Sequence, residues 1–481
     1  MSNTTQALSR IEAILDDSSF VEIGARVTAR ATDFNMQEKK APSDGVITGY
    51  GVVNGNLVYV YSQDASVLGG TIGEMHAKKI ASLYEKAMKM GAPVVGLIDC
   101  AGLRLQEATD ALNGFGEIYK NMSLASGIIP QITAVYGECG GGLAVLAELS
   151  DFVFVEEKKA KLFVNSPNAL DGNYESKLDT SSAKFMAEAG VVDFVGDEET
   201  IANGVRQLVS MLPSNNAEGT VCTDNQDDLN RVCQDMEAEI ADPALALTDI
   251  SDDGVFVETK AEYAKEMVTG FILVDGITVG AVANRTALYD ENGEKAEEFA
   301  PVLTTAGAYK AAEFVTFCNA FEIPVLTLTN VKGFEATVKS ERTIAKAAAK
   351  LVYAFSNADV PKVNIITGEA YGSAYVAMNS KSIGADMVYA WPQASIGMMD
   401  ASLAAKIMYA DDIAASKDVT STINEKAAEY AALQSSVDQA AARGYVDTII
   451  NPEDTRKYVA AAFEMLFDKR EVRADKKHGT V

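Results

Sequence analysis

The stretch PQITAVYGECGGG occupies residues 130–142, and a stretch of the same design, PKVNIITGEAYGSA, occupies residues 361–374. Each begins with proline, continues as an apolar run, and ends in glycine and other small residues ahead of a helical segment. A continuous apolar run predicts a strand that is buried on both faces, which is typical of a parallel sheet covered by helices. The repeated strand-to-helix turn therefore decides the fold class.

The preceding strands are repeated at the same distance. Apolar runs at residues 93–99 and 324–330 each lead into a glycine turn, at Gly102 and Gly333. The two offsets agree, because 324 − 93 = 231 and 361 − 130 = 231. Equal spacing over two successive strands predicts one structural unit that occurs twice in the chain.

The segments further upstream complete each unit. Residues 49–61 and 270–282 each contain two β-rich runs around an Asn-Gly or Asp-Gly pair, which predicts a hairpin. Residues 73–90 and 306–321 have the apolar spacing of helices. Alternating strands and helices predict an α/β architecture in duplicate.

Length supports two domains. A chain of 481 residues exceeds the size at which a single hydrophobic core usually keeps growing. The segment at residues 213–243 is poor in apolar residues, so we expect domains at 1–235 and 236–481.

Charge and cysteine content limit the function classes. The chain has 41 basic and 68 acidic residues, for a formal net charge of −27. This charge opposes binding to nucleic acid, and it requires a local basic patch for any phosphate ligand. Five cysteines without a CxxC pair predict neither a metal site nor a disulfide framework. With no signal-like or membrane-spanning segment in the sequence, we expect a cytoplasmic protein.

The glycine turns suggest a chemical role. A strand that ends in a turn opening a helix leaves backbone N–H groups without acceptors, and such groups stabilise an oxyanion or bind a phosphate equally well. The alternative interpretation is that the glycines of such a turn only permit the backbone conformation and close packing. Two matched pairs favour a site, and the candidate donors are Gly102 and Leu103 with Gly141 and Gly142, and Gly333 and Phe334 with Ser373 and Ala374.

Several segments resemble the biotin-dependent acyl-CoA carboxyltransferase family, of the propionyl-CoA carboxylase beta and methylmalonyl-CoA decarboxylase alpha type. In the first half these are SDGVITGYG at 43–51, GGTIGEMHAKKI at 69–80 and ASGIIPQ at 125–131. In the second half they are AYGSAY at 370–375 and ARGYVD at 442–447. The resemblance keeps one order over almost the whole chain, which makes it far more specific than a single short motif.

The resemblance implies two tandem crotonase-like domains and a homo-hexamer built as a dimer of trimers. Residues 1–235 would hold the coenzyme A thioester, and residues 236–481 would hold biotin delivered on a separate carrier protein or domain. The implied partners are a biotin carboxyl carrier protein and either a biotin carboxylase or a membrane decarboxylase pump subunit. The pump partner would place the chain at the membrane periphery.

The resemblance also assigns residues. All eight candidate donors take a catalytic role, with the thioester side at Gly102, Leu103, Gly141 and Gly142. The implied biotin-binding residues are Gly333, Phe334, Gly372, Ser373 and Ala374, and the implied substrate-binding residues are Gly102, Gly141, Gly142 and Val376. Apolar Val376 suits a short acyl chain. The implied chemistry releases carbon dioxide from carboxybiotin, removes the acyl α-proton and carboxylates the enolate.

The chain departs from the family pattern at identifiable places. Leu103 stands where an alanine is usual, and Ser373 replaces the second glycine of a pair. The stretch at 334–346 is shorter than expected. A serine forced to positive φ at position 373 would be strained, whereas a backbone donor survives a side-chain replacement if its dihedral angles permit.

Other reactive side chains have less support. The sequence AMKM at 87–90 matches a biotin-attachment core, but it closes an amphipathic helix, so Lys89 is interpreted as a helix end. His76 lacks a partner for base catalysis. Cys100 and Cys139 lie beside the turns and are interpreted as packing residues. His478 ends a basic tail at 469–477 that is either solvated or phosphate-binding.

Substrate and direction stay open. Propionyl- and methylmalonyl-CoA are the leading pair, with acetyl- and malonyl-CoA next, and either carboxylation or decarboxylation fits. The alternatives are a glutaconyl-CoA-type decarboxylase subunit, a non-catalytic scaffold paralogue, and a biotin-independent crotonase-type enzyme. The last requires an acidic side chain at the turns, for which Glu107 and Glu138 are the candidates.

Overall fold

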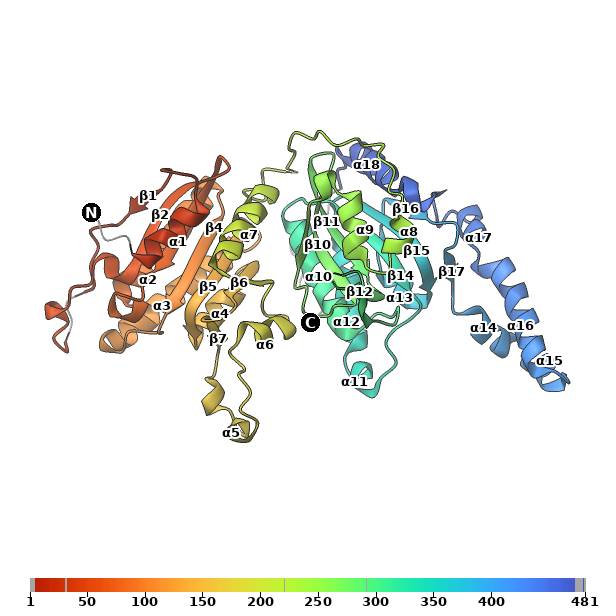
Figure 1. Ribbon diagram of the computed structural model, residues 1–481, viewed down its shortest axis with the longest axis horizontal. Helices are drawn as coiled ribbons and strands as arrows, with labels where there is room; N and C mark the ends of the chain where they lie inside the picture. The colour runs from red at the N-terminus through yellow and green to blue at the C-terminus, as the bar shows by residue number, and fades with distance from the viewer. Residues whose placement is uncertain (1–4, 31–32, 220, 291, 472–478, 480–481) are drawn as a thin grey trace. The chain divides into compact units, whose positions relative to one another are not determined.

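The computed structural model describes residues 5–30, 33–219, 221–290, 292–471 and 479 (Figure 1). It divides into two compact units. Unit 1 comprises Met1–Val221 and Lys260–Tyr263, and unit 2 comprises Cys222–Thr259 and Ala264–Val481. Both units are mixed α/β, which confirms the predicted fold class. Of the basic tail, Lys469 is described and lies 2.8 Å from Asp386, whereas residues 472–478, which include His478, lie outside the described residues.

One mixed sheet forms the centre of unit 1. Its strand order is β1-β2-β3-β4-β5-β6-β8, with β7 paired to β5. The strands are β1 (Val21–Ile23), β2 (Val46–Val53), β3 (Asn56–Gln63), β4 (Val94–Cys100), β5 (Gln131–Gly140), β6 (Phe152–Glu156), β7 (Lys161–Phe163) and β8 (Phe194–Gly196). β1, β2 and β3 pair antiparallel, whereas β3 through β8 pair parallel. The predicted hairpin at the Asn54-Gly55 pair is confirmed.

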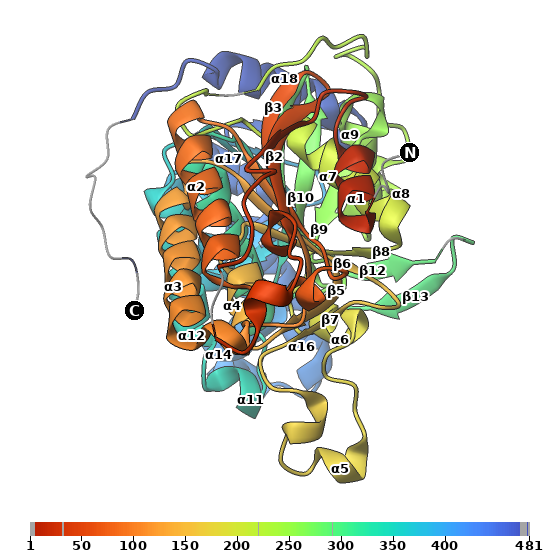
Figure 2. The same cartoon turned by 90° about the vertical axis from the view of Figure 1, so that its left-hand side faces the viewer.

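Helices cover both faces of this sheet. They are α1 (Gln6–Ile14), α2 (Glu74–Met90), α3 (Ala108–Ala125), α4 (Gly142–Glu148), α5 (Asn173–Ser176), α6 (Ala183–Glu188) and α7 (Glu198–Met211). Helices α2 and α3 pack side by side on one face, and α1 and α7 pack on the other (Figure 2). Lys89 is exposed at the last turn of α2, where Gly91 ends the helix at φ +62°. That position agrees with the interpretation of Lys89 as a helix end.

Unit 2 repeats the same plan. Its main sheet has the order β18-β16-β15-β14-β11-β10-β9, with β17 paired to β15. The strands are β9 (Phe256–Thr259), β10 (Met267–Val274), β11 (Ile277–Asn284), β14 (Val325–Val331), β15 (Lys362–Tyr371), β16 (Met387–Ala390), β17 (Ser395–Gly397) and β18 (Thr448–Ile449), and a separate ribbon is formed by β12 (Ala287–Tyr289) and β13 (Lys295–Glu298). The β10–β11 hairpin is followed by parallel strands, as in unit 1. The predicted duplication is therefore present in the sheet topology.

The helices of unit 2 are also arranged as in unit 1. They are α8 (Met236–Glu239), α9 (Pro243–Ile250), α10 (Thr305–Ala320), α11 (Val338–Glu341), α12 (Ile344–Asn357), α13 (Gly372–Ala377), α14 (Ala401–Met408), α15 (Ala410–Ala415), α16 (Val419–Tyr430), α17 (Val437–Ala442) and α18 (Thr455–Leu466). Helices α10 and α12 pack together as α2 and α3 do, while α14, α15 and α16 project from the body of the unit (Figure 1). Among the described residues, no helix combines the length and the apolar character needed to cross a membrane.

The core of unit 1 is closely packed around β4. A Cβ atom added to Gly96 would overlap the ring and hydroxyl of Tyr61, which is fully buried. We expect Gly96→Ala to lower the free energy of unfolding by about 1–3 kcal/mol, because overpacking forces neighbouring side chains to move. The thermal midpoint, followed by circular dichroism, should fall with it. Gly116→Ala is the control, since Gly116 is exposed on α3 and a Cβ atom there would meet no other atom. Equal midpoints for the two variants would contradict the prediction.

Candidate active site at two glycine turns

The first turn, residues 101–104, follows β4 and is called the Leu103 turn. It forms a parallel bridge with Ile72. The Ile72 amide donates to the Gly102 carbonyl at 2.9 Å, and the Arg104 amide donates to the Ile72 carbonyl at 2.9 Å. In such a bridge the residue between the two bonded neighbours directs its own N–H to the opposite side. Within the described residues the Leu103 amide accordingly donates no hydrogen bond.

The second turn, residues 140–142, follows β5 and is called the Gly142 turn. Gly141 adopts φ +64° and ψ −126°, a conformation that a side chain disfavours. Its amide donates to the Phe163 carbonyl at 2.8 Å and is thus occupied. Gly142 begins α4, and its amide donates no hydrogen bond within the part of the chain that the structure describes. The turn therefore offers one unbonded donor, at Gly142.

The two turns lie next to each other because β4 and β5 are neighbouring parallel strands, with Cys100 paired to Cys139. Together they line a cavity of about 760 Å³. The lining residues are Cys100, Ala101, Gly102, Leu103, Leu112, Phe115, Gly116, Tyr119, Glu138, Gly140, Gly141, Gly142 and Phe163. All four predicted thioester-side residues thus share one cavity. Its walls are largely apolar, which suits an acyl group.

A buried ion cluster stands behind the Leu103 turn. Arg104 Nη1 lies 2.6 Å from Asp44 Oδ1 and 2.8 Å from Glu107 Oε1, and all three side chains are at most 1% exposed. Arg104 Nη2 also donates to the Thr71 carbonyl at 2.7 Å. Burial raises the pKa of the Asp44 carboxyl, and Arg104 opposes that rise. The cluster fixes residues 71–73, which are the segment that bridges to the Leu103 turn.

The same carboxylates hold the start of α2. Glu107 Oε2 accepts from the Glu74 amide at 2.6 Å, and Asp44 Oδ2 accepts from the His76 amide at 2.7 Å. Gly73, the N-cap residue, has no room for a side chain because Arg104 and Glu107 fill the space. Glu107 is therefore committed to the protein interior, which removes it as the acid of a crotonase-type hydratase.

The remaining candidates beside the turns differ in access. His76 is fully buried, with its ring nitrogens 2.9 Å from the Asp44 carbonyl and 3.2 Å from Gln63 Nε2. Burial lowers the pKa of His76 to about 3. Burial also raises the pKa of the Cys100 thiol to about 12 and that of Cys139 further still, so neither is a nucleophile at neutral pH. Glu138 alone of the acidic candidates lines the cavity.

Unit 2 contains the same backbone arrangement. The Leu303 amide donates to the Gly333 carbonyl at 2.9 Å, and the Glu335 amide donates to the Leu303 carbonyl at 3.0 Å. The amide of Phe334 therefore points away from this bridge, as that of Leu103 does in unit 1. Among the described residues it donates no hydrogen bond.

The expected strain at Ser373 is absent. The left-handed position of this turn is Gly372, at φ +62°, and Ser373 has no positive φ. Gly372 corresponds to Gly141, since 372 − 141 = 231. Ser373 is exposed and Ala374 is buried on α13, and half-buried Val376 follows on the same helix. Replacing glycine by serine at 373 thus leaves the backbone geometry unaffected.

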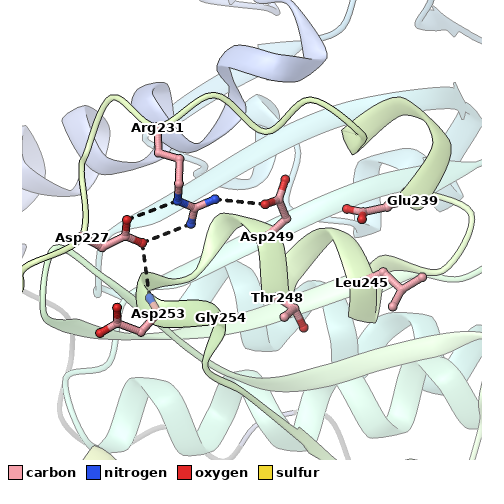
Figure 3. A pocket seen from close by; sticks show the side chains of 8 residues that line it. All are labelled: Asp227, Arg231, Glu239, Leu245, Thr248, Asp249, Asp253 and Gly254. Carbon is pink, nitrogen blue, oxygen red and sulfur yellow. Dashed lines mark hydrogen bonds and ion pairs between the residues drawn. The ribbon is translucent and has the colours of Figure 1, made fainter. Parts of the chain in front are cut away.

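Another cavity, of about 470 Å³, lies in unit 2 away from the predicted residues (Figure 3). Three of its charged side chains are paired with one another: Arg231 contacts Asp249 at 3.0 Å and Asp227 at 3.1 Å. The Asp253 amide also donates to Asp227 at 3.3 Å. These contacts hold residues 227–231 against α9. We interpret the cluster as structural.

An α/β protein in which residues with unbonded amides, at the ends of two strands, line an apolar cavity has the design of an enzyme that stabilises an oxyanion. The family described as "Carboxyl transferase domain" matches residues 2–481. The chain belongs to this carboxyl transferase family, which confirms the resemblance found in its sequence.

Similar proteins cover the whole chain. Methylmalonyl-CoA decarboxylase subunit alpha of Propionigenium modestum is 39% identical, over 99% of this chain and 92% of that protein. Propionyl-CoA carboxylase beta chain of Roseobacter denitrificans is 38% identical, over 99% and 93%. A crystal structure of transcarboxylase 12S, with methylmalonyl-coenzyme A and methylmalonic acid bound, superimposes with a TM-score of 0.91 at 35% identity, over 99% of this chain and 92% of that one. The two units are accordingly crotonase-like domains.

The buried position of His76 determines how its imidazole titrates in solution. Because its folded-state pKa is about 3, the imidazole should stay neutral, and its NMR signals should not titrate, between pH 5 and 8. The unfolded chain binds a proton near pH 6.5, so this depressed pKa makes stability fall as the pH drops below about 6.5. His478→Asn assigns the signal, since the chain has two histidines. A midpoint near 6.5 in the folded protein would contradict the buried position.

The space around Gly142 gives a second prediction. A Cβ atom at this position would lie 2.8 Å from Tyr119 Oη and 3.0 Å from a Phe115 ring carbon. Gly142→Ala should therefore displace the amide and lower kcat for carboxyl transfer by about 100-fold, the scale of losing one oxyanion donor. Val145→Ala, on the exposed side of the same helix, is the control. Retention of kcat within threefold would show that the Gly142 amide is not a donor.

Proposed function

We propose that the chain is the carboxyltransferase subunit of a biotin-dependent acyl-CoA carboxylase or decarboxylase, acting on propionyl- or methylmalonyl-CoA. The observation that carries this proposal is the pair of unbonded amides, at Leu103 and Gly142, on the wall of one apolar cavity. Two N–H donors aimed at one point stabilise the enolate oxygen of a thioester. The two relatives at 38–39% identity, named for methylmalonyl-CoA decarboxylase and propionyl-CoA carboxylase, support the substrate class.

The two domains then have different tasks. Residues 1–235 hold the acyl-CoA, with Gly102 and Gly141 setting the direction of the donors at Leu103 and Gly142. Residues 236–481 receive biotin, because the amide of Phe334 donates no hydrogen bond among the described residues and Ser373 is exposed in the first turn of α13. Biotin held on a carrier at these residues would supply the carboxyl group and a base for the acyl α-proton. The contribution of the chain is to orient both reactants and to stabilise developing negative charge.

The partners follow from this assignment. We infer a hexamer, since the similar transcarboxylase 12S structure is described as a hexamer assembly. A biotin carboxyl carrier protein is required, because the AMKM sequence of this chain lies in α2 and not on an exposed hairpin tip. A biotin carboxylase would drive carboxylation, and a membrane pump subunit would use decarboxylation.

A second candidate function depends on Glu138. Its side chain lines the cavity beside the Gly142 turn, so a biotin-independent crotonase-type reaction would have an acid or base there. Substitution Glu138→Gln separates the two functions. Loss of activity on a biotin-independent substrate supports this second candidate, and retained carboxyl transfer removes it.

The direct test is carboxyl exchange between free biotin, or a biotinylated carrier, and a panel of propionyl-, acetyl-, butyryl- and glutaconyl-level CoA esters. We expect the highest kcat/KM with the propionyl/methylmalonyl pair, and at least a 10-fold preference over the butyryl level, because added methylenes must fit beside Leu103 and Phe163. Gly142→Ala serves as the site-impaired control. No exchange with any ester, although coenzyme A esters bind, would favour the non-catalytic paralogue.

A further inference from the structure

Tyr119 connects helix α3 to the Gly142 turn. Its hydroxyl donates a hydrogen bond to the Gly142 carbonyl at 2.6 Å. One helical turn earlier, Phe115 packs edge-on against Tyr119, with ring centroids 5.3 Å apart and an interplanar angle of 88°. Both aromatic side chains line the cavity, and both lie where a Gly142 side chain would otherwise be. This aromatic pair therefore defines the position of Gly142.

The Gly142 turn needs such a contact. Three consecutive glycines, at residues 140–142, have more conformational freedom than any other tripeptide, and they lie directly before a helix of 7 residues. Gly140 is paired to Phe163 at the end of β5, the Gly141 amide donates to the Phe163 carbonyl, and the Gly141 carbonyl accepts from Ala144. Among the described residues, none of these bonds uses the Gly142 amide. The direction of the Gly142 amide consequently depends on contacts from outside the turn.

Helix α3 is a rigid support for this contact. Ile118 and Met122, which flank Tyr119 on the helix, are fully buried in the core of unit 1. Gln131 Nε2 donates to the Met122 carbonyl at 3.1 Å and so joins α3 to β5, the strand that leads into the turn. A side chain on a well-packed helix positions a functional group more accurately than one on a loop.

Unit 2 lacks the corresponding side chains. Buried Ile118 and Met122 of α3 correspond to buried Leu351 and Phe355 of α12, since 351 − 118 = 233 and 355 − 122 = 233. The same offset matches Tyr119 with Val352, since 352 − 119 = 233. A valine has no hydroxyl to donate. The two turns share a backbone design, but within the described residues no tyrosine donates to Ser373 as Tyr119 donates to Gly142.

We propose that Tyr119 is a positioning residue, which holds the Gly142 amide in line with the oxygen of the bound thioester. This inference rests on the proposed function, in which that amide stabilises the enolate. The phenol binds the carbonyl of the Gly142–Leu143 peptide, and it acts on the Gly142 N–H, which belongs to the preceding peptide, by fixing the φ and ψ angles of Gly142. It should therefore affect the transition state more than the binding of the ester.

The test is Tyr119→Phe, which keeps the ring and removes only the hydroxyl. We expect kcat for carboxyl transfer to fall about 10-fold, less than the 100-fold or more for complete loss of an oxyanion donor, because the amide is loosened and not removed. KM, and the Kd of propionyl-CoA measured by calorimetry, should stay within about twofold of wild type. Tyr50→Phe, a half-exposed tyrosine on β2 of the same unit, is the matched control and should leave every value unchanged.

Two further readouts keep the inference separate from general stability and from the proposed function. In a double-mutant cycle, Tyr119→Phe should cost less in the Gly142→Ala background, since the hydroxyl and the added methyl compete for the same space. Hydrogen exchange of a peptide spanning residues 137–147 should be faster in Tyr119→Phe, whether or not the protein turns over. If the wild-type protein is inactive but exchange is still faster in Tyr119→Phe than in wild type, the proposed function is rejected and the positioning role is retained.

Three results would overturn the inference. One is an unchanged kcat in Tyr119→Phe. Another is a Kd for propionyl-CoA that weakens in parallel with kcat, which would make Tyr119 a substrate contact. The third is additive behaviour in the double-mutant cycle together with unaltered hydrogen exchange.

Discussion

The bridge between Ile72 and the Leu103 turn is the constraint on which the site depends. It uses the backbone groups of Gly102 and Arg104 and leaves the intervening amide of Leu103 free. The bridge itself is held by the buried Arg104 cluster, in which Asp44 and Glu107 also cap α2. One group of charges thus fixes a helix, a turn and a hydrogen-bond donor together. A site made of backbone amides requires this support, because the direction of a backbone N–H is set only by the conformation of the chain around it.

Duplication gives the protein two such sites with different surroundings. The Leu303 bridge repeats the Ile72 bridge bond for bond, and Gly372 repeats the left-handed conformation of Gly141. The supports differ: unit 1 uses an arginine cluster and an aromatic pair, whereas in unit 2 the N-cap residue of α10, Thr304, accepts from the Gly307 amide with its own side chain. The shared backbone accounts for the common ability to stabilise an anion. The different supports agree with our proposal that each unit accepts a different ligand.

The strands and the glycine turns that follow them could be predicted from sequence, because they depend on local patterns. The constant offset of 231 located all four central strands and the turns that follow them. The buried cluster could not be predicted, since Asp44 and Arg104 are 60 residues apart and their charges alone do not indicate burial. The contact between Tyr119 and Gly142 was likewise invisible, because it joins a helix to a turn 23 residues later. Whether Ser373 would be strained could not be decided from sequence, which does not show that Gly372, and not Ser373, takes the positive φ of this turn.

The Leu103 amide, which donates no hydrogen bond among the described residues, is a backbone group that alanine scanning cannot test. An alanine at position 103 would keep the N–H group, so a scan of side chains would pass over the donor itself. Only a change to the main chain, such as proline or a backbone ester, deletes it. The residues that a scan would single out are the supports, Arg104 and Tyr119, and neither carries the amide that we propose to stabilise the charge. In a protein of this kind, side-chain mutations identify the residues that support the site, and they do not identify the backbone amides themselves.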